Sequence, residues 1–448
     1  MRRNKKRKNN NFRKILLIIL IIILISTIAI FSFKKITNYQ KQLELNKEKE
    51  QINNIKSHYS EYVITTKETD LLNSEEKVVG KINKNIRLLL EEIPITTETK
   101  YFKIKDMDNI YFIAYQDVTK TDEFTYDERY KKYIPFNKNI KTKESTTFYD
   151  LEGNMIYKIN SSYSFPIIID NNDNYGIEFN NQLLYIKNED IESIYDQHNT
   201  DLKNTKGVPV FNYHAFYDKN NATESSECNT SICHSTEQFK THLDYFKDNN
   251  ILTLKMSEFE LYLDKKLQLP KSVLLTIDDG GRTIHAINML TEYKMYATIF
   301  LITSWFSPEE YYKTEYIELH SHSHDLHNAG KCPGGQGGGI KCLPKETILS
   351  DLKTSRSLLN NTTAFCYPFY EYNQYSINLL KEAGFTMAFV GEEGDMIAHP
   401  GVNKYRIPRF VIMTHTKMSD ISALFNKVSK HVNKHVFIYI ISFTNKLL

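Results

Sequence analysis

An uninterrupted apolar run lies near the N-terminus of the chain. Residues 15–33, with the sequence ILLIILIIILISTIAIFSF, contain no charged side chain. As a helix rising about 1.5 Å per residue, the run would be about 28 Å long, enough to cross a bilayer core of roughly 30 Å. Eight lysines and arginines precede it within residues 1–14, which predicts a cytoplasmic N-terminus and a body outside the cell.

The residues after this run indicate an uncleaved anchor followed by a stalk. A secretory signal peptide is the alternative interpretation, but no A-x-A cleavage site follows the run. Residues 34–58 are polar and charged and contain neither Pro nor Gly, which predicts a helical or extended stalk. We therefore expect a basic tail over residues 1–14, a transmembrane anchor over 15–33 and a stalk over 34–58.

Between residues 59 and 200, short apolar and aromatic runs alternate with polar turns. Runs such as NIYFIAY, TTFYDL and MIYKI are separated by Asp, Asn and Gly, which is typical of a small all-β region. Two stretches, YFKIKDMDNIYFIAYQDV and YGIEFNNQLLYIKNEDI, resemble bacterial SH3-like modules that associate with cell walls. A β-rich spacer without a binding role is the alternative interpretation.

From about residue 205 to the C-terminus at 448, strand and helix patterns alternate. SVLLTI and ATIFLI read as buried strands, and AINMLTEY and QYSINLLKEAG have helical spacing. This alternation predicts parallel strands joined by crossover helices, in an α/β domain of the barrel-like kind. In such a domain the chemistry gathers at the carboxyl ends of the strands. The apolar tail HVFIYIISF, residues 435–443, is too short to span a membrane and is expected to form a last strand.

The charge distribution and the cysteines indicate which partners the protein can bind and whether its cysteines form disulfides. The net charge of +3 is concentrated in the basic tail, so the remainder is slightly acidic, which argues against a nucleic-acid-binding body. Outside the cell, the close cysteine pairs Cys228–Cys233 and Cys332–Cys342 are expected to form disulfides. A zinc site of four thiolates is the alternative, although neither pair has the two-residue spacing of a zinc knuckle. Cys366 is expected to be unpaired and buried.

Two adjacent carboxylates follow a predicted buried strand. Asp278 and Asp279 come directly after SVLLTI, and Gly280 and Gly281 allow a sharp turn there. Adjacent residues of an extended chain point in opposite directions, so the two carboxylates would have different neighbours and different roles. An Asp-Asp-Gly turn that merely ends a strand is the alternative interpretation of the pair taken alone.

A histidine-dense segment favours a metal site. Residues 318–328, ELHSHSHDLHN, hold four of the 14 histidines of the chain, at positions 320, 322, 324 and 327. Imidazole is the commonest side-chain ligand of divalent transition metals. The segment follows the aspartate pair by one strand and helix, which would bring both to the same edge of a parallel sheet.

With these motifs in order, residues 205–430 resemble the NodB-type polysaccharide deacetylases of carbohydrate esterase family four. TIDDG matches the family's TFDDG motif, and SHSHDLH resembles its histidine motif. FCYPFYEYN resembles its third motif, and VPVFNYHAF resembles the first strand of its extracellular members. The resemblance implies a deformed (β/α) barrel of the NodB type, here preceded by the all-β region and the transmembrane helix.

Two histidine registers are possible within this resemblance. His320 and His324 are four residues apart, and His322 and His327 are five residues apart. The segment is more similar to the exopolysaccharide deacetylase branch, which acts on poly-N-acetylglucosamine and uses the five-residue step after a serine. We therefore choose His322 and His327 as metal ligands.

The resemblance also implies a division of roles. Asp279 would join His322 and His327 in holding one divalent ion, which we expect to be zinc, with cobalt, nickel or manganese as alternatives. Asp278 would be the general base that takes a proton from the attacking water. Backbone N–H groups of the third motif would stabilise the oxyanion, and its aromatic rings would contact a sugar. These residues are Tyr367, Pro368, Phe369 and Tyr370.

The sequence departs from the family pattern at three places. No arginine precedes the proline of the third motif, so Arg409 is our candidate to orient Asp278, with Arg406 as its competitor. Family members often supply a late histidine as general acid, and the residues around the candidates here fit that pattern poorly. His415 is our candidate for this role, ahead of His399. The glycine of the third motif is replaced by Tyr370, so its turn is expected to differ.

These residues predict a membrane-anchored, metal-dependent enzyme whose catalytic domain lies outside the cell. Its expected substrate is a polysaccharide containing N-acetylglucosamine, of the poly-N-acetylglucosamine type, from which it would remove N-acetyl groups. Peptidoglycan is the alternative substrate, favoured if residues 59–200 bind the cell wall. A wall-binding protein that has lost activity is the alternative from another class.

Overall fold

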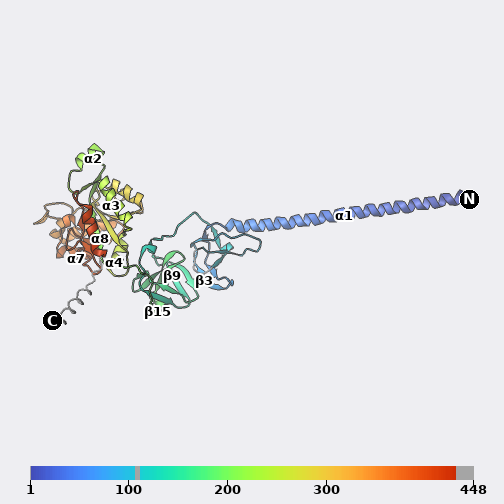
Figure 1. Cartoon of the computed structure of the whole chain (residues 1–448), viewed down its shortest axis with the longest axis horizontal. Coiled ribbons are helices and arrows are strands. Elements are labelled where there is room, and N and C mark those ends of the chain that lie inside the picture. Colours follow the sequence, from blue (N-terminus) through green and yellow to red (C-terminus); the bar gives the residue numbers. More distant parts are fainter. Residues whose placement is uncertain (1, 106–110, 430–448) are drawn as a thin grey trace, which may run out of the picture. The chain divides into compact units, whose positions relative to one another are not determined.

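The computed structural model, drawn in Figure 1, describes residues 2–105 and 111–429. These residues divide into two compact units. The first unit contains the described residues within Met1–Tyr126, Lys143–Ser162 and Phe179–Gln182. The second contains the described residues within Asp127–Thr142, Tyr163–Glu178 and Leu183–Leu448. Residues 435–443, for which we expect a last strand, lie outside the described residues.

A single helix, α1 (Arg2–His58), joins the predicted tail, anchor and stalk. It appears in blue in Figure 1 as one unbroken element. The apolar side chains between Ile15 and Phe33 are exposed along it, because nothing in the described chain covers them. Its length and composition suffice to cross a membrane, as for a membrane anchor or a signal sequence.

The remaining part of the first unit is built from antiparallel strands, as predicted. One sheet has the order β4-β1-β7, and the neighbouring strands of the other follow the order β9-β10-β3-β2-β6-β5. Alternate residues such as Leu71, Phe102 and Phe148 are buried, as in sheets with one covered face. The bounds are β1 (Tyr62–Thr65), β2 (Thr69–Leu72), β3 (Val78–Ile82), β4 (Arg87–Leu89), β5 (Tyr101–Lys103), β6 (Phe112–Ala114), β7 (Val118–Lys120), β9 (Thr146–Tyr149) and β10 (Met155–Ile159).

Part of the predicted β-rich region groups with the second unit. Strands β8 (Lys138–Thr142), β11 (Ser164–Pro166) and β15 (Ile191–Asp196) form a small sheet, in which β8 is central. Most residues of β12 (Ile169–Asp170), β13 (Asn174–Phe179) and β14 (Gln182–Lys187) also group here. Within this unit, Arg129 forms a buried ion pair with Glu258 of helix α4 (Met256–Leu263).

A curled parallel sheet forms the core of the second unit and confirms the predicted α/β class. Its parallel strands follow the order β24-β23-β22-β21-β20-β16, and β25 lies antiparallel beside β16. The segment after Ile407 closes the curl, since Ile407 bridges to β24 while β26 pairs with β16. The bounds are β16 (Val208–Tyr213), β19 (Leu252–Thr253), β20 (Ser272–Asp279), β21 (Ala297–Leu301), β22 (Ile317–Ser321), β23 (Ala364–Cys366), β24 (Met387–Phe389), β25 (Ile397–Ala398) and β26 (Phe410–Val411).

Helices cover the outside of this sheet (Figure 1), and local sequence sets where they begin and end. In α7, Asn373 caps the first turn through its side chain, and Gly384 in a left-handed conformation (φ 89°) ends the helix. β20 is buried from Ser272 to Ile277 because helices and neighbouring strands cover it. The bounds are α2 (Ala222–Glu227), α3 (Thr236–Asp248), α5 (Ile284–Tyr293), α6 (Lys345–Leu358), α7 (Gln374–Ala383) and α8 (Met418–Ser429); β17 (Ala215–Tyr217) pairs with β18 (Cys233–Ser235).

Candidate active site

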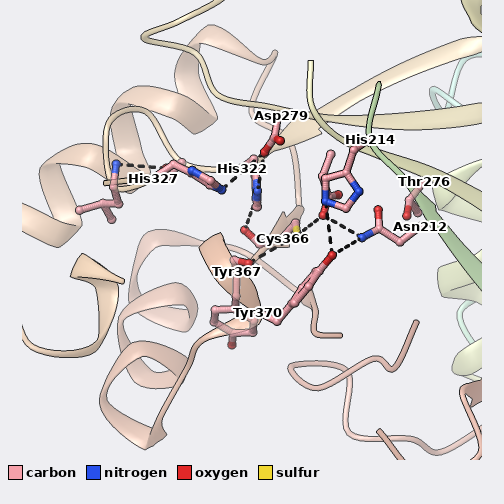
Figure 2. Close-up of polar contacts among 12 residues, drawn as sticks. Asn212, His214, Thr276, Asp279, His322, His327, Cys366, Tyr367 and Tyr370 are labelled. Atoms are coloured by element: carbon pink, nitrogen blue, oxygen red, sulfur yellow. Dashed lines mark hydrogen bonds and ion pairs between the residues drawn. The ribbon is translucent and has the colours of Figure 1, made fainter. Parts of the chain in front are cut away.

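A pocket of about 520 Å³ opens where the carboxyl ends of β16, β20, β22 and β23 meet. This is the edge at which parallel α/β sheets commonly bind ligands. Figure 2 shows the polar side chains that converge there. The lining residues are His214, Ile232, Asp278, Asp279, His322, His327, Phe369, Tyr370, Glu392, Val411 and Met413.

Asp278 is held by a buried arginine. Arg409 donates from Nη1 to Asp278 Oδ1 at 2.7 Å and from Nη2 to Oδ2 at 2.8 Å, and both side chains are almost completely buried. Asn212 donates a further hydrogen bond to Oδ2 at 3.1 Å. Burial alone would raise the pKa of Asp278, but the charge of Arg409 outweighs it, so the pKa lies well below its usual range. Asp278 is therefore an ionised acceptor with a fixed orientation.

Asp279 turns away from Asp278 towards two histidines. Its Oδ1 lies 3.4 Å from His322 Nε2 and 3.5 Å from His327 Nε2. The three candidate ligand atoms lie within 4.8 Å of one another. Asp279 has a left-handed backbone (φ 71°), and Gly280 follows at φ 105°. A Cβ on Gly280 would lie 2.4 Å from Leu301 Cδ1, so only glycine fits this turn.

The two histidines are prepared as ligands by their surroundings. His322 Nδ1 lies 2.8 Å from the carbonyl oxygen of Cys366, so Nδ1 carries the proton and Nε2 is free to coordinate. Burial lowers the pKa of His327 to about 4, which keeps its ring neutral. Burial also opposes a charge on His322, yet Cys366 and Asp279 raise its pKa well above the usual value. The space between Asp279, His322 and His327 therefore favours a positive charge. One carboxylate and two imidazoles are a donor set that fits a divalent ion.

The other two histidines of the segment point elsewhere. His320 is hydrogen bonded through Nδ1 to the hydroxyl of Thr362, away from the pocket. His324 Nδ1 lies 3.0 Å from Thr303 Oγ1. The geometry therefore groups His322 and His327, not His320 and His324, with Asp279.

The third-motif turn lines the pocket through Phe369 and Tyr370. Phe369 and Tyr370 are both in left-handed conformations (φ 58° and 59°), which costs about 1 kcal/mol or more for a residue with a Cβ. The backbone N–H groups of Tyr367 and Tyr370 donate to Phe389 and Tyr367 carbonyls. Since Pro368 has no N–H, Phe369 is the residue of this turn whose N–H has no protein acceptor in the described part of the chain.

Comparison with known proteins places the chain in a family. The family description "Polysaccharide deacetylase" matches residues 265–388. The chain is 32% identical over 200 residues to the poly-beta-1,6-N-acetyl-D-glucosamine N-deacetylase of Staphylococcus aureus, covering 40% of this chain and 67% of that protein. It is 29% identical to the Staphylococcus epidermidis enzyme of the same name, over 39% of this chain and 66% of that protein. The chain belongs to the polysaccharide deacetylase family.

Two solved structures of related proteins are also similar to this chain. The IcaB structure from Ammonifex degensii shares 20% identity and covers 50% of this chain and 98% of its own, with a TM-score of 0.42. A polysaccharide deacetylase from Bacillus cereus shares 16% identity and covers 75% of this chain and 98% of its own, with a TM-score of 0.41.

The structure of this deacetylase adds residues that the sequence did not single out. His214 lines the pocket one residue beyond β16, and its Nε2 lies 3.3 Å from the hydroxyl of Tyr370. Asn212 donates to that same hydroxyl at 2.9 Å. Cys366 is buried, as expected, with Sγ 3.4 Å from Asp278 Oδ2 and 3.0 Å from Arg409 Nη2. The sequence analysis missed His214 because only the pairing of β16 with β20 brings this residue opposite the aspartates.

The remaining predicted residues lie outside the pocket of the deacetylase. His415 is exposed in the loop before α8 and does not line the pocket. Arg406 pairs with Glu393 at 3.0 Å, and His399 pairs with Asp395 at 3.0 Å, both on the surface. Neither arrangement brings these side chains to Asp278 in the described part of the chain.

Both predicted cysteine pairs are joined as disulfides in the deacetylase, Cys228 with Cys233 and Cys332 with Cys342. The second closes the glycine-rich loop, whose backbone N–H groups at Gln336 and Gly338 donate to Glu371 at 2.5 and 2.7 Å. Lys341 Nζ lies 2.8 Å from the same carboxylate. Because Glu371 directly follows Tyr370, the loop is attached to the strained turn beside the pocket.

Proposed function

We propose that the protein is a membrane-anchored, zinc-dependent N-deacetylase that acts outside the cell on N-acetylglucosamine units of a β-1,6-linked polysaccharide. One observation carries the proposal. Asp279, His322 and His327 converge beside an ionised Asp278 that Arg409 holds in place, all in one pocket. Three nitrogen and oxygen ligands with space left for water and substrate are typical of catalytic rather than structural metal sites.

The residues of the pocket divide the hydrolysis between them. A divalent ion held by Asp279, His322 and His327 would supply Lewis acidity and a water of lowered pKa. Asp278 accepts the proton of the attacking water, and Arg409 keeps its carboxylate ionised and oriented. The N–H of Phe369 donates to the oxygen that becomes negative in the tetrahedral intermediate.

His214, not His415, is our candidate for the proton donor to the departing amine. It faces the pocket on the side of Asp278, whereas His415 is outside the lining. Burial lowers the pKa of His214, while the carboxylates of Asp278 and Asp279 oppose that shift. A protonated imidazole in this position would be a strong acid and would give up its proton readily to an amine.

The names of the relatives and the histidine step favour the β-1,6-linked polymer as substrate. The Staphylococcus relatives are named for that polymer, and His322 and His327 use the five-residue step. Peptidoglycan remains the second candidate, since the antiparallel first unit is a candidate wall-binding region.

Acetate release tests the proposal. The full-length protein in detergent is incubated with β-1,6-linked N-acetylglucosamine oligomers and with peptidoglycan, after chelation and after zinc is restored. We expect zinc-dependent acetate release that is faster on the β-1,6-linked oligomers. Faster acetate release from peptidoglycan would show that peptidoglycan, the second candidate, is the preferred substrate. Metal-loaded protein that releases no acetate from either polymer would leave the inactive wall-binding protein as the better interpretation.

A further inference from the structure

The chain contains one tryptophan, and its ring is half exposed. Trp305 follows β21 and has 50% of its surface accessible to water. A single exposed apolar side chain is ordinary on a protein surface and needs no special explanation by itself. The position of Trp305 beside the pocket is what makes its exposure informative.

Trp305 extends an aromatic wall out of the pocket. The ring of Phe369, which lines the pocket, packs on His327 at a centroid distance of 4.3 Å. The ring of Trp305 also contacts His327, in an edge arrangement at a centroid distance of 5.5 Å. The three rings therefore lead from the pocket lining to the exposed surface. A substrate longer than one sugar would meet Trp305 as it leaves the pocket.

The backbone around Trp305 is fixed against the histidine segment. Thr303 N donates to the carbonyl of Ser323 at 3.2 Å, and Ser304 N donates to the carbonyl of His324 at 3.1 Å. His324 also holds this loop through the contact of its Nδ1 with Thr303 Oγ1. His324, which lies outside the metal group, thus has a structural task, and the exposed indole is presented on a rigid support.

We propose that Trp305 is a sugar-stacking subsite for the pyranose ring next to the one whose acetyl group enters the pocket. The C–H face of a pyranose is apolar, and a rigid indole offers a large flat surface at little cost in conformational entropy. Trp305 contacts the candidate metal ligand His327 and is half exposed, so the indole offers a flat apolar surface close to the metal group. The subsite rests on the proposed function, because it assumes a polymeric sugar substrate.

Kinetics on substrates of two lengths test the subsite. Removing the indole in Trp305→Ala takes away binding that only a longer substrate uses, so the ratio of kcat/KM for a β-1,6-linked tetramer to that for N-acetylglucosamine falls by about tenfold. Trp305→Phe restores most of the ratio. Tyr312→Ala removes another exposed ring, whose side chain is 48% accessible, and leaves the ratio at the wild-type value. An unchanged ratio in Trp305→Ala would overturn the proposal.

Tryptophan emission gives a readout that does not depend on turnover. Since Trp305 is the only tryptophan, emission of the full-length Asp278→Asn protein reports directly on this ring. Adding the tetramer shifts the emission in a saturable way, and adding glycerol at the same concentration does not. Absence of a shift at saturating tetramer contradicts the subsite.

Acetate release compared with emission, and the zinc content of Trp305→Ala, distinguish failure of the proposed function from failure of the subsite. If wild-type protein releases no acetate but its emission responds to the tetramer, the proposed function fails and the sugar site stands. If Trp305→Ala loses bound zinc together with activity, the indole only orients His327 and the subsite is wrong. Zinc content near the wild-type value, with the reduced length ratio, supports the subsite.

Discussion

Arg409 and Asp278 are 131 positions apart in the sequence and meet through two hydrogen bonds of 2.7 and 2.8 Å. Arg409 Nε also donates to the carbonyl of Val390 at 2.9 Å, so the guanidinium has little freedom to leave the carboxylate. A planar guanidinium matches both carboxylate oxygens, which lysine cannot do. The pair supplies what the third motif lacks, an arginine that orients the aspartate.

Asp278→Asn should remove the general base while leaving the metal group intact. We expect kcat for acetate release to fall by about 10²–10⁴-fold, because the amide does not accept the proton of the attacking water. Acetate release and zinc content of the same preparation check the prediction. Turnover close to that of the wild type would show that the role assigned to Asp278 is wrong.

The histidine register can be tested by metal affinity alone. We expect His322→Ala and His327→Ala each to weaken zinc binding by about 100-fold or more, because each removes a ligand. His324→Ala is the matched control, since His324 contacts Thr303 and lies outside the metal group. Competition with a zinc chelator measures all three. If His324→Ala weakens zinc binding the most, the register must be reversed.

His214→Gln should slow the reaction without affecting the metal. Loss of the proton donor to the amine is expected to reduce kcat by about 10²-fold or more. Zinc binding should stay near the wild-type value, because His214 is not in the ligand group of the described residues. His415→Gln serves as control and is expected to keep kcat. The opposite ranking of these two variants would return the acid role to His415.

Glu371→Gln should loosen the glycine-rich loop and the turn that it supports. The carboxylate accepts two backbone N–H groups and pairs with Lys341, and this charge is lost in the variant. We expect kcat to fall by roughly tenfold, the effect of about 1.4 kcal/mol, with zinc binding retained. Glu382→Gln breaks an exposed ion pair with Lys345 and is the matched control. If Glu371→Gln and Glu382→Gln have the same kcat, the glycine-rich loop does not contribute to catalysis.

Acidic pH should destabilise the second unit through buried neutral histidines. Burial lowers the pKa of His242 to about 4, whereas the unfolded chain has a value near 6.5. Between these values the unfolded state binds more protons, so the free energy of unfolding falls as pH drops through that window. At pH 4.5 the loss from His242 amounts to about 2–3 kcal/mol relative to pH 7.

Emission of Trp305 during unfolding at both pH values measures this loss in the unit that holds it. His242→Gln, which does not titrate, should show a smaller difference between pH 7 and pH 4.5. His198→Gln changes an exposed histidine, 65% accessible, and should keep the wild-type difference. An equal difference in His242→Gln and the wild type would exclude the buried ring as the cause.

Local patterns in the sequence determined the elements and the chemistry they carry. The run 15–33 needs only length and apolarity to predict its helix, and alternating strand and helix runs predicted the α/β class. Asp278 and Asp279 followed by two glycines, and histidines five residues apart, are signals that the chain carries within one turn or loop. Spacing on this scale is set by backbone geometry, which the sequence specifies directly.

Only the tertiary structure decided how distant side chains meet. Asn212 reaches Asp278 across 66 positions because β16 pairs with β20, and that pairing also places His214 in the pocket. Arg409, not Arg406, reaches Asp278, because the segment after Ile407 closes the curled sheet and buries this side chain. Strand order, sheet closure and burial depend on packing of the whole unit, so no local pattern of residues encodes them.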